Sequence, residues 1–123
     1  MGGGNYKSGS DFERQIKSLY EANGFVCQRS AGSHSAADLI AVKKEEGIMI
    51  GDWVQCKKER KKNGLYVKDI QQLSELPIGV GWRRVLFVKR KGIVDVKVVN
   101  KNVARLVGKF TVKEINGVIK DAN

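Results

Sequence analysis

The sequence is poor in several residues that would assign it to a protein class. Its 123 residues include one proline, two cysteines and one histidine, and 7% are aromatic. Two cysteines, Cys27 and Cys56, do not make a disulfide framework, and with His34 they still lack a fourth zinc ligand. We therefore expect reduced cysteines on strands of a cytoplasmic protein.

Long hydrophobic runs are also missing. No apolar run approaches the roughly 18 residues that a membrane-spanning helix needs. The N-terminus is rich in glycine and lacks the apolar segment of a signal peptide. A Met-Gly start is compatible with myristoylation, although glycine-rich tails are far more common. We expect a flexible tail over residues 1–8, a single domain over residues 9–123 and no membrane partner.

Acidic residues are few compared with basic ones. The chain has 23 lysines and arginines against 13 acidic residues, which gives a formal net charge of +10. The excess is concentrated in residues 57–62, in Arg83-Arg84 and in residues 89–91. One such run is usually a solvated surface, but three on a small domain favour a polyanionic partner, foremost nucleic acid. A membrane surface or an acidic protein is the alternative.

Hydrophobic spacing and turn signals predict a mixed α/β sheet with helices on its faces. A capping box at residues 10–13 should begin a helix that ends at Asn23-Gly24. Asp69 should cap a second helix that stops at Pro77, and a second capping box at residues 111–114 should open the last. The expected strands are residues 25–27, 39–42, 48–54, 83–90 and 93–99, with 85–88 buried on both faces and 93–99 exposed or at an edge. Residues 101–109 are ambiguous.

Residues 38–57 carry the strongest functional signal. Two apolar runs flank a charged segment that ends in Gly47, which is typical of a β-hairpin. The hairpin should bring Asp38 close to Gln55 and Lys57, whose side chains share one face because they are two residues apart on a strand. An acid and a lysine that meet on a basic protein suggest phosphodiester chemistry.

Several short motifs together resemble the archaeal-type Holliday junction resolvases of the PD-(D/E)xK nuclease superfamily. The matching positions are Lys7, Gly9 and Glu13, the serine-bearing loop 30–35, Asp38-Leu39-Ile40-Ala41, Gln55-Cys56-Lys57, Leu65-Tyr66-Val67 and Gln71. The resemblance covers roughly residues 7–90 and implies a restriction-endonuclease-like sheet flanked by helices. It further implies a homodimer that resolves four-way DNA junctions by paired symmetric nicks.

The resemblance also implies the site. Mg²⁺, with Mn²⁺ as an alternative, would be held by Glu13, Asp38, Gln55 and the Cys56 carbonyl, and it would activate water and polarise the phosphate. Lys57 would orient that water or stabilise the charge on phosphorus, and a loop serine, Ser30, would lie near the scissile phosphate. The expected DNA contacts are Lys7, Arg29, Ser33, His34, Lys58, Arg60, Lys61, Lys62 and Gln71. Residues 65–76 and 93–99 are candidate dimer surfaces.

Gln55 departs from the family pattern, which has an acid at this position. An amide oxygen can bind Mg²⁺ but brings no charge. Two alternatives therefore stay open: a DNA-binding module of the same fold that cuts weakly or not at all, and another nuclease of the superfamily, such as a restriction-type enzyme or a nickase. Glu13 and Lys57 also have simpler explanations, as part of the capping box and as a solvated lysine.

Overall fold

The computed structural model describes residues 2–30, 36–59 and 66–120 of the chain. In chain order the elements are α1 (Gly2–Ala22), β1 (Val26–Arg29), β2 (Leu39–Glu45), β3 (Ile48–Lys58), α2 (Val67–Ser74), β4 (Trp82–Arg90), β5 (Ile93–Asn100), β6 (Val103–Thr111) and α3 (Val112–Lys120). The predicted order is confirmed, with β6 added in the region that the sequence left ambiguous. No helix in these three ranges is long and apolar enough to cross a membrane.

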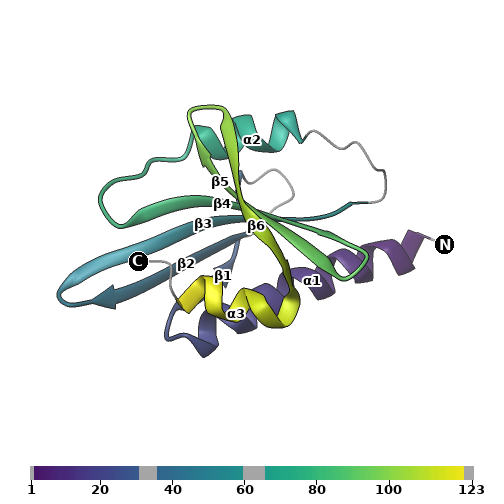
Figure 1. Ribbon diagram of the computed structural model, residues 1–123, viewed down its shortest axis with the longest axis horizontal. Helices are drawn as coiled ribbons and strands as arrows, with labels where there is room; N and C mark the ends of the chain where they lie inside the picture. Colours follow the sequence, from purple (N-terminus) through teal and green to yellow (C-terminus); the bar gives the residue numbers. More distant parts are fainter. Residues whose placement is uncertain (1, 31–35, 60–65, 121–123) are drawn as a thin grey trace.

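The strands form one mixed sheet in the order β1-β2-β3-β4-β5-β6. β3 and β4 are parallel, and the other neighbours are antiparallel. Helices α1 and α3 lie on one face of the sheet and α2 on the other (Figure 1). The predicted fold class, a mixed α/β sheet flanked by helices, is confirmed.

The β2–β3 hairpin has the predicted register. Glu45 pairs with Ile48, and Glu46 and Gly47 form the turn with φ angles of 51° and 81°. Two successive left-handed residues are the signature of the tight hairpin turn that matches strand twist. At the other end of the hairpin Leu39 is opposite Val54, which places Asp38 at the level of Gln55.

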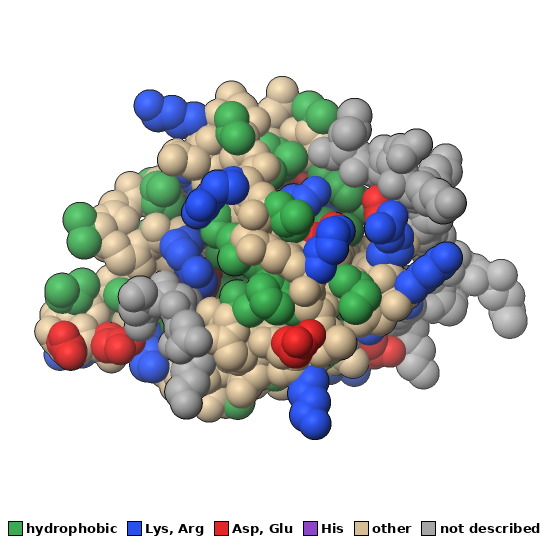
Figure 2. All heavy atoms as spheres, viewed as in Figure 1, with side chains coloured by type: hydrophobic (Ala, Val, Ile, Leu, Met, Phe, Trp, Pro, Cys, Tyr) green, Lys and Arg blue, Asp and Glu red, His purple; other side chains and the backbone are tan. Residues whose placement is uncertain are grey.

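On the face shown in Figure 2, the basic side chains of the described residues are spread out rather than gathered in one block. Figure 2 shows lysine and arginine side chains across one face, with acidic ones between several of them. Two arginines of the predicted basic runs are instead bound by the protein itself. Arg83 pairs with Asp52, and Arg84 donates two hydrogen bonds to the Leu76 carbonyl. These two guanidinium groups therefore have partners within the protein.

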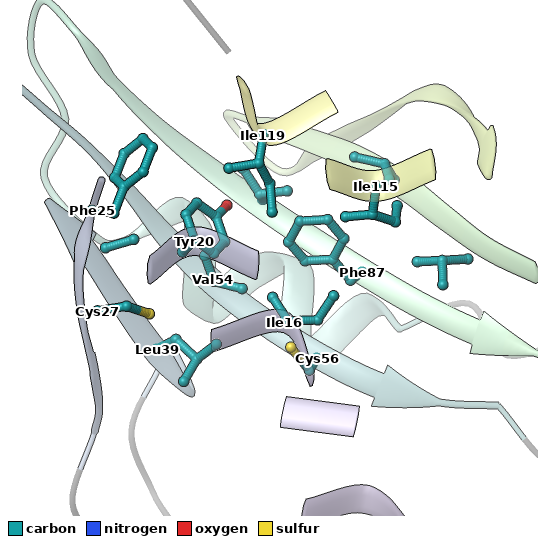
Figure 3. Packing of buried hydrophobic residues seen from close by; sticks show 14 of the residues in the cluster. Ile16, Tyr20, Phe25, Cys27, Leu39, Val54, Cys56, Phe87, Ile115 and Ile119 are labelled. Carbon is teal, nitrogen blue, oxygen red and sulfur yellow. The ribbon is translucent and has the colours of Figure 1, made fainter. Parts of the chain in front are cut away.

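The larger hydrophobic core lies between the sheet and the helices α1 and α3. Figure 3 shows Ile16 and Tyr20 of α1 and Ile115 and Ile119 of α3 packed around Phe87. A smaller core lies under α2 around Leu73. β4 contributes Val85 and Phe87 to the first core and Leu86 and Val88 to the second, so residues 85–88 are buried on both faces, as predicted. Cys27 on β1 and Cys56 on β3 are buried and free, as expected, and burial raises the pKa of Cys27 to about 11.

Two local predictions about chain ends and edges are wrong. Helix α1 begins at Gly2, so Ser10 lies inside the helix and cannot cap it. β5 is an inner strand, because β6 pairs with it and forms the edge. By contrast, the predicted alternation of β5 is confirmed: Val94 and Val96 face the core under α1 and α3, and Val99 faces the core under α2. The capping box at the start of α3 is also confirmed: the Thr111 and Glu114 amides each donate to the other residue's side chain.

The start of α2 also differs from the expectation. Its N-cap is Tyr66, which has a left-handed backbone with a φ of 52° and makes no side-chain cap. Asp69 lies in the first helical turn instead of capping it. Tyr66 is therefore left-handed and Val67 begins the helix, so Asp69 is available for another contact.

One buried carboxylate, Asp52, ties α1 to the sheet. It is 3% exposed, accepts a hydrogen bond of 2.6 Å from the Tyr20 hydroxyl and pairs with the Arg83 guanidinium through both oxygens. Burying a carboxylate is costly unless it is paired and hydrogen-bonded, and Asp52 is both. Because Tyr20 is on α1, this pair fixes the position of the helix that carries Glu13.

Removing the Tyr20 hydroxyl should destabilise the protein measurably. We expect Tyr20→Phe to lower the free energy of unfolding by about 1.5–3 kcal/mol, as for a lost hydrogen bond to a charged group. Urea unfolding followed by circular dichroism measures this. As a control, Lys109→Gln removes the exposed Lys109–Asp95 ion pair and should change stability by less than about 0.5 kcal/mol. Equal effects of the two substitutions would contradict this role of Asp52.

Candidate active site

Backbone hydrogen bonds hold Asp38 at the open end of the β2–β3 hairpin. Its own N–H donates to the Val54 carbonyl at 2.7 Å, and its carboxylate oxygen Oδ2 accepts from the Cys56 N–H at 2.9 Å. The Ser30 N–H donates to the Asp38 carbonyl at 2.8 Å, which joins the end of β1 to the same point. The predicted approach of Asp38 to the Gln55-Cys56-Lys57 segment is thus confirmed.

Glu13 reaches this point from α1. Its Oε1 lies 3.5 Å from Nε of Arg29, so an ion pair links the helix to the end of β1. Burial raises the pKa of Glu13, and the negative charge of Asp38 raises it further. Arg29 and Lys57 act in the opposite direction. Glu13, Asp38 and Lys57 therefore lie close enough for their charges to interact.

The carboxyl of Asp38 is held in an environment that disfavours its charge. Burial is the main cause of its raised pKa, and Asp69 adds to it. The Cys56 N–H, Lys57 and Arg29 oppose the rise but do not cancel it. Two partly buried carboxylates that repel each other are stabilised by a bound cation, because its positive charge offsets both the desolvation and the repulsion.

Gln55 and Lys57 point to the α2 side of the sheet. Val54 and Cys56 belong to the core under α1, so the alternation of β3 directs residues 55 and 57 to the opposite face. Gln55 is 6% exposed, and its Oε1 is buried without a hydrogen-bond partner in the described part of the structure. Leaving such an oxygen unpaired costs about 1–3 kcal/mol. A hard cation would satisfy it.

The predicted ligands offer the oxygen atoms that a divalent ion such as Mg²⁺ binds, but they do not form a cluster of acidic side chains. Within residues 2–30, 36–59 and 66–120, no group of three or more His, Cys, Asp or Glu side chains is arranged to hold a metal. The available donors are the carboxylates of Glu13 and Asp38 and the amide oxygen of Gln55. The Cys56 carbonyl can join them, because a strand residue directs its N–H and C=O to the same side and the N–H already reaches Asp38.

Lys57 pairs with Asp69, an acid that the sequence predicted to be a helix cap. Its Nζ lies 3.2 Å from Oδ1 of Asp69, which comes from the first turn of α2. The sequence signal for Asp69 was an acid at a helix start, and it was explained as a cap. An acid in the first turn of a helix that packs over β3 can also reach a lysine on that face, which would have predicted this ion pair.

The structure places only some of the predicted DNA-contacting residues. Arg29, Lys58 and Gln71 are exposed, with Arg29 paired to Glu13. The backbone of Lys7 lies in α1, but its side chain is outside the described part. The remaining predicted contacts also lie outside the described residues: Ser33, His34, Arg60, Lys61 and Lys62.

Comparison with known proteins agrees with the resemblance seen in the sequence. The model of the archaeal Holliday junction resolvase (Hjc) family matches residues 4–118. A protein named crossover junction endodeoxyribonuclease Hjc from Methanocaldococcus jannaschii is 38% identical over 88 residues, or 71% of this chain. The match spans 62% of that relative's own length. The chain belongs to the archaeal Holliday junction resolvase family.

Proposed function

We propose that this protein is a metal-dependent endonuclease that recognises branched DNA and resolves four-way junctions by paired symmetric nicks. The observation that carries the proposal is the hydrogen bond from the Cys56 N–H to Asp38, which sets a carboxylate beside the Gln55 and Lys57 face. The relative from Methanocaldococcus jannaschii is named for cleavage of crossover junctions, and this chain aligns with 62% of it.

Each residue of the site has a distinct role in this proposal. A divalent ion, Mg²⁺ or Mn²⁺, would supply a polarised phosphoryl oxygen and a water of lowered pKa. Asp38, Glu13, the Gln55 amide and the Cys56 carbonyl would hold it. Lys57 would donate hydrogen bonds to the attacking water or to the phosphoryl oxygens as their charge grows.

The distribution of charge supports binding to the DNA backbone. Lysines and arginines recur over the face seen in Figure 2. Arg29 pairs with Glu13, and Lys58 follows Lys57 on β3. Such contacts release counterions, so affinity should fall steeply with salt. None of the helices in the described ranges resembles a recognition helix, so we expect readout of DNA shape rather than of base sequence.

We further propose that the enzyme acts as a homodimer, because paired nicks require two sites related by a twofold axis. The candidate dimer surfaces 65–76 and 93–99 contribute Leu73, Val94 and Val96 to the core of the single chain. The edge strand β6 is the better candidate, because Val103, Leu106 and Val107 are exposed there. An exposed apolar edge strand invites pairing with another chain.

The alternative is a module that holds DNA without cutting it, and the neutral Gln55 is the observation that favours it. The deciding experiment incubates the protein with a synthetic four-way junction and a matching linear duplex in Mg²⁺, Mn²⁺ or EDTA. Paired symmetric nicks in the junction alone, dependent on metal, support the resolvase. Binding without nicks in either metal favours the module, and equal cutting of both DNAs favours a different nuclease of the superfamily.

Asp38→Asn should remove cleavage while sparing binding. We expect a loss of at least about 10²–10³-fold in the rate of junction cleavage, as for other groups that act on the reacting centre. Junction affinity in EDTA should be unchanged or slightly higher, because a negative charge near phosphate is lost. Asp95→Asn is the matched control, since Asp95 pairs with Lys109 on β5 and β6. A cleaving Asp38→Asn protein would contradict the site.

Without metal, the ionised carboxylate of Asp38 should lower the free energy of unfolding of the wild-type protein. Burial raises the folded-state pKa of Asp38 above its ordinary 3.8, so its contribution to stability is present below that pH and is lost as pH rises through the folded pKa. Asn keeps an oxygen that accepts from Cys56 and never ionises. In EDTA at about pH 7, Asp38→Asn should therefore unfold at higher urea than wild type, and the difference should vanish near pH 3–4. A less stable variant at neutral pH would contradict the raised pKa of Asp38.

Gln55→Glu restores the family's acid and should raise or preserve Mg²⁺ affinity. Without metal, the added carboxylate is buried opposite Asp38, so the variant should be less stable than wild type in EDTA. The stabilisation on adding Mg²⁺, measured as the shift in urea unfolding, should exceed that of wild type; a tenfold gain in affinity corresponds to about 1.4 kcal/mol. Gln15→Glu, at an exposed position on α1, is the control and should leave the Mg²⁺ shift as in wild type. A Mg²⁺ shift no larger than wild type, together with complete loss of cleavage, would mean that the site is misplaced.

A further inference from the structure

Asp69 is an acid at the candidate site to which no function has been assigned. Its Oδ1 lies 3.2 Å from the Lys57 Nζ, and its side chain is only 18% exposed. The negative charge of Asp69 also raises the pKa of Asp38, which lies at the start of the other strand of the hairpin. Asp69 therefore contacts Lys57 and is close enough to Asp38 for their charges to interact.

The position of Asp69 is fixed by the packing of α2. Leu73, one helical turn further on, is buried in the core under this helix, and Ile70 packs against the same core. At the start of the helix the Tyr66 hydroxyl donates to the Glu59 carboxylate at the end of β3, which ties the helix start to that strand. These contacts hold the first turn of α2 over the strand that carries Gln55 and Lys57.

A simple surface ion pair is the alternative explanation of the Lys57–Asp69 contact. Such pairs contribute little and are common. Three features favour a larger role: Asp69 is mostly buried, it interacts with Asp38 as well as with Lys57, and the neighbouring Gln55 Oε1 is buried without a partner among the described residues. Gln55 lies opposite Asp38 in the hairpin and two residues from Lys57, the partner of Asp69. Two carboxylates and an unpaired amide oxygen are donors suited to a hard cation.

We propose that Asp69 supplies the acidic ligand that this chain lacks at position 55. Asp38, Asp69 and the Gln55 Oε1 would together hold the divalent ion, so the missing charge is provided from α2 instead of β3. When the metal binds, Lys57 would leave Asp69 and pair with the phosphate of the substrate instead. This inference rests on the proposed metal-dependent function and names one further residue of its site.

The test measures Mn²⁺ binding to the full chain by electron paramagnetic resonance of the free ion, without DNA. We expect Asp69→Asn to weaken binding by about 10-fold or more, the size of effect seen when the surroundings of a metal are altered. Asp38→Asn should weaken it at least as much. Glu75→Gln removes one exposed carboxylate at the end of the same helix and should leave Mn²⁺ affinity unchanged.

A double variant separates a ligand from a structural residue. Gln55→Glu introduced into Asp69→Asn returns an acid to the site and should recover Mn²⁺ affinity to within about threefold of wild type. Unfolding in EDTA checks that each variant is folded. Wild-type affinity in Asp69→Asn, or no recovery in a folded double variant, would overturn the inference even if cleavage changes. If Asp38→Asn also binds Mn²⁺ like wild type, the proposed metal site itself fails.

Discussion

The hydrogen bond from the Cys56 N–H to the Asp38 carboxylate is the contact on which the site depends. Asp38 stands where β2 begins, and its N–H is bound in turn by the Val54 carbonyl. A shift of the hairpin by one residue would turn Gln55 and Lys57 to the other face of the sheet. The tight turn at Glu46 and Gly47 prevents that shift from the far end. The geometry of the site is therefore a property of the hairpin.

Two carboxylates on the hairpin show how structure and function differ in one small protein. Asp52 is almost completely buried, and Tyr20 and Arg83 satisfy both of its oxygens. Asp38 has one backbone donor and a pKa that burial raises. Asp52 stabilises the fold because its charge is matched. The charge of Asp38 is only partly matched, and such perturbed pKa values cluster at functional sites.

The parts of the fold predicted from sequence are those encoded locally. The turn of the hairpin, the doubly buried strand 85–88 and the capping box of α3 each depend on a few neighbouring residues, and all are confirmed. The start of α1 was missed because glycine is a poor helix former, so a glycine-rich segment predicts a tail. β6 was missed because most of its side chains are exposed and it is held by pairing with β5. Asp69 was misassigned because its contact with Lys57 joins segments that are distant in sequence.

The most direct test of this metal site is the location of Mn²⁺ by anomalous scattering in crystals of the full chain. We predict a single strong peak within coordination distance of the Asp38 carboxylate and of the Gln55 Oε1. A well-occupied Mn²⁺ elsewhere on the protein, with Gln55 still unpaired and the space beside Asp38 empty, would contradict the site.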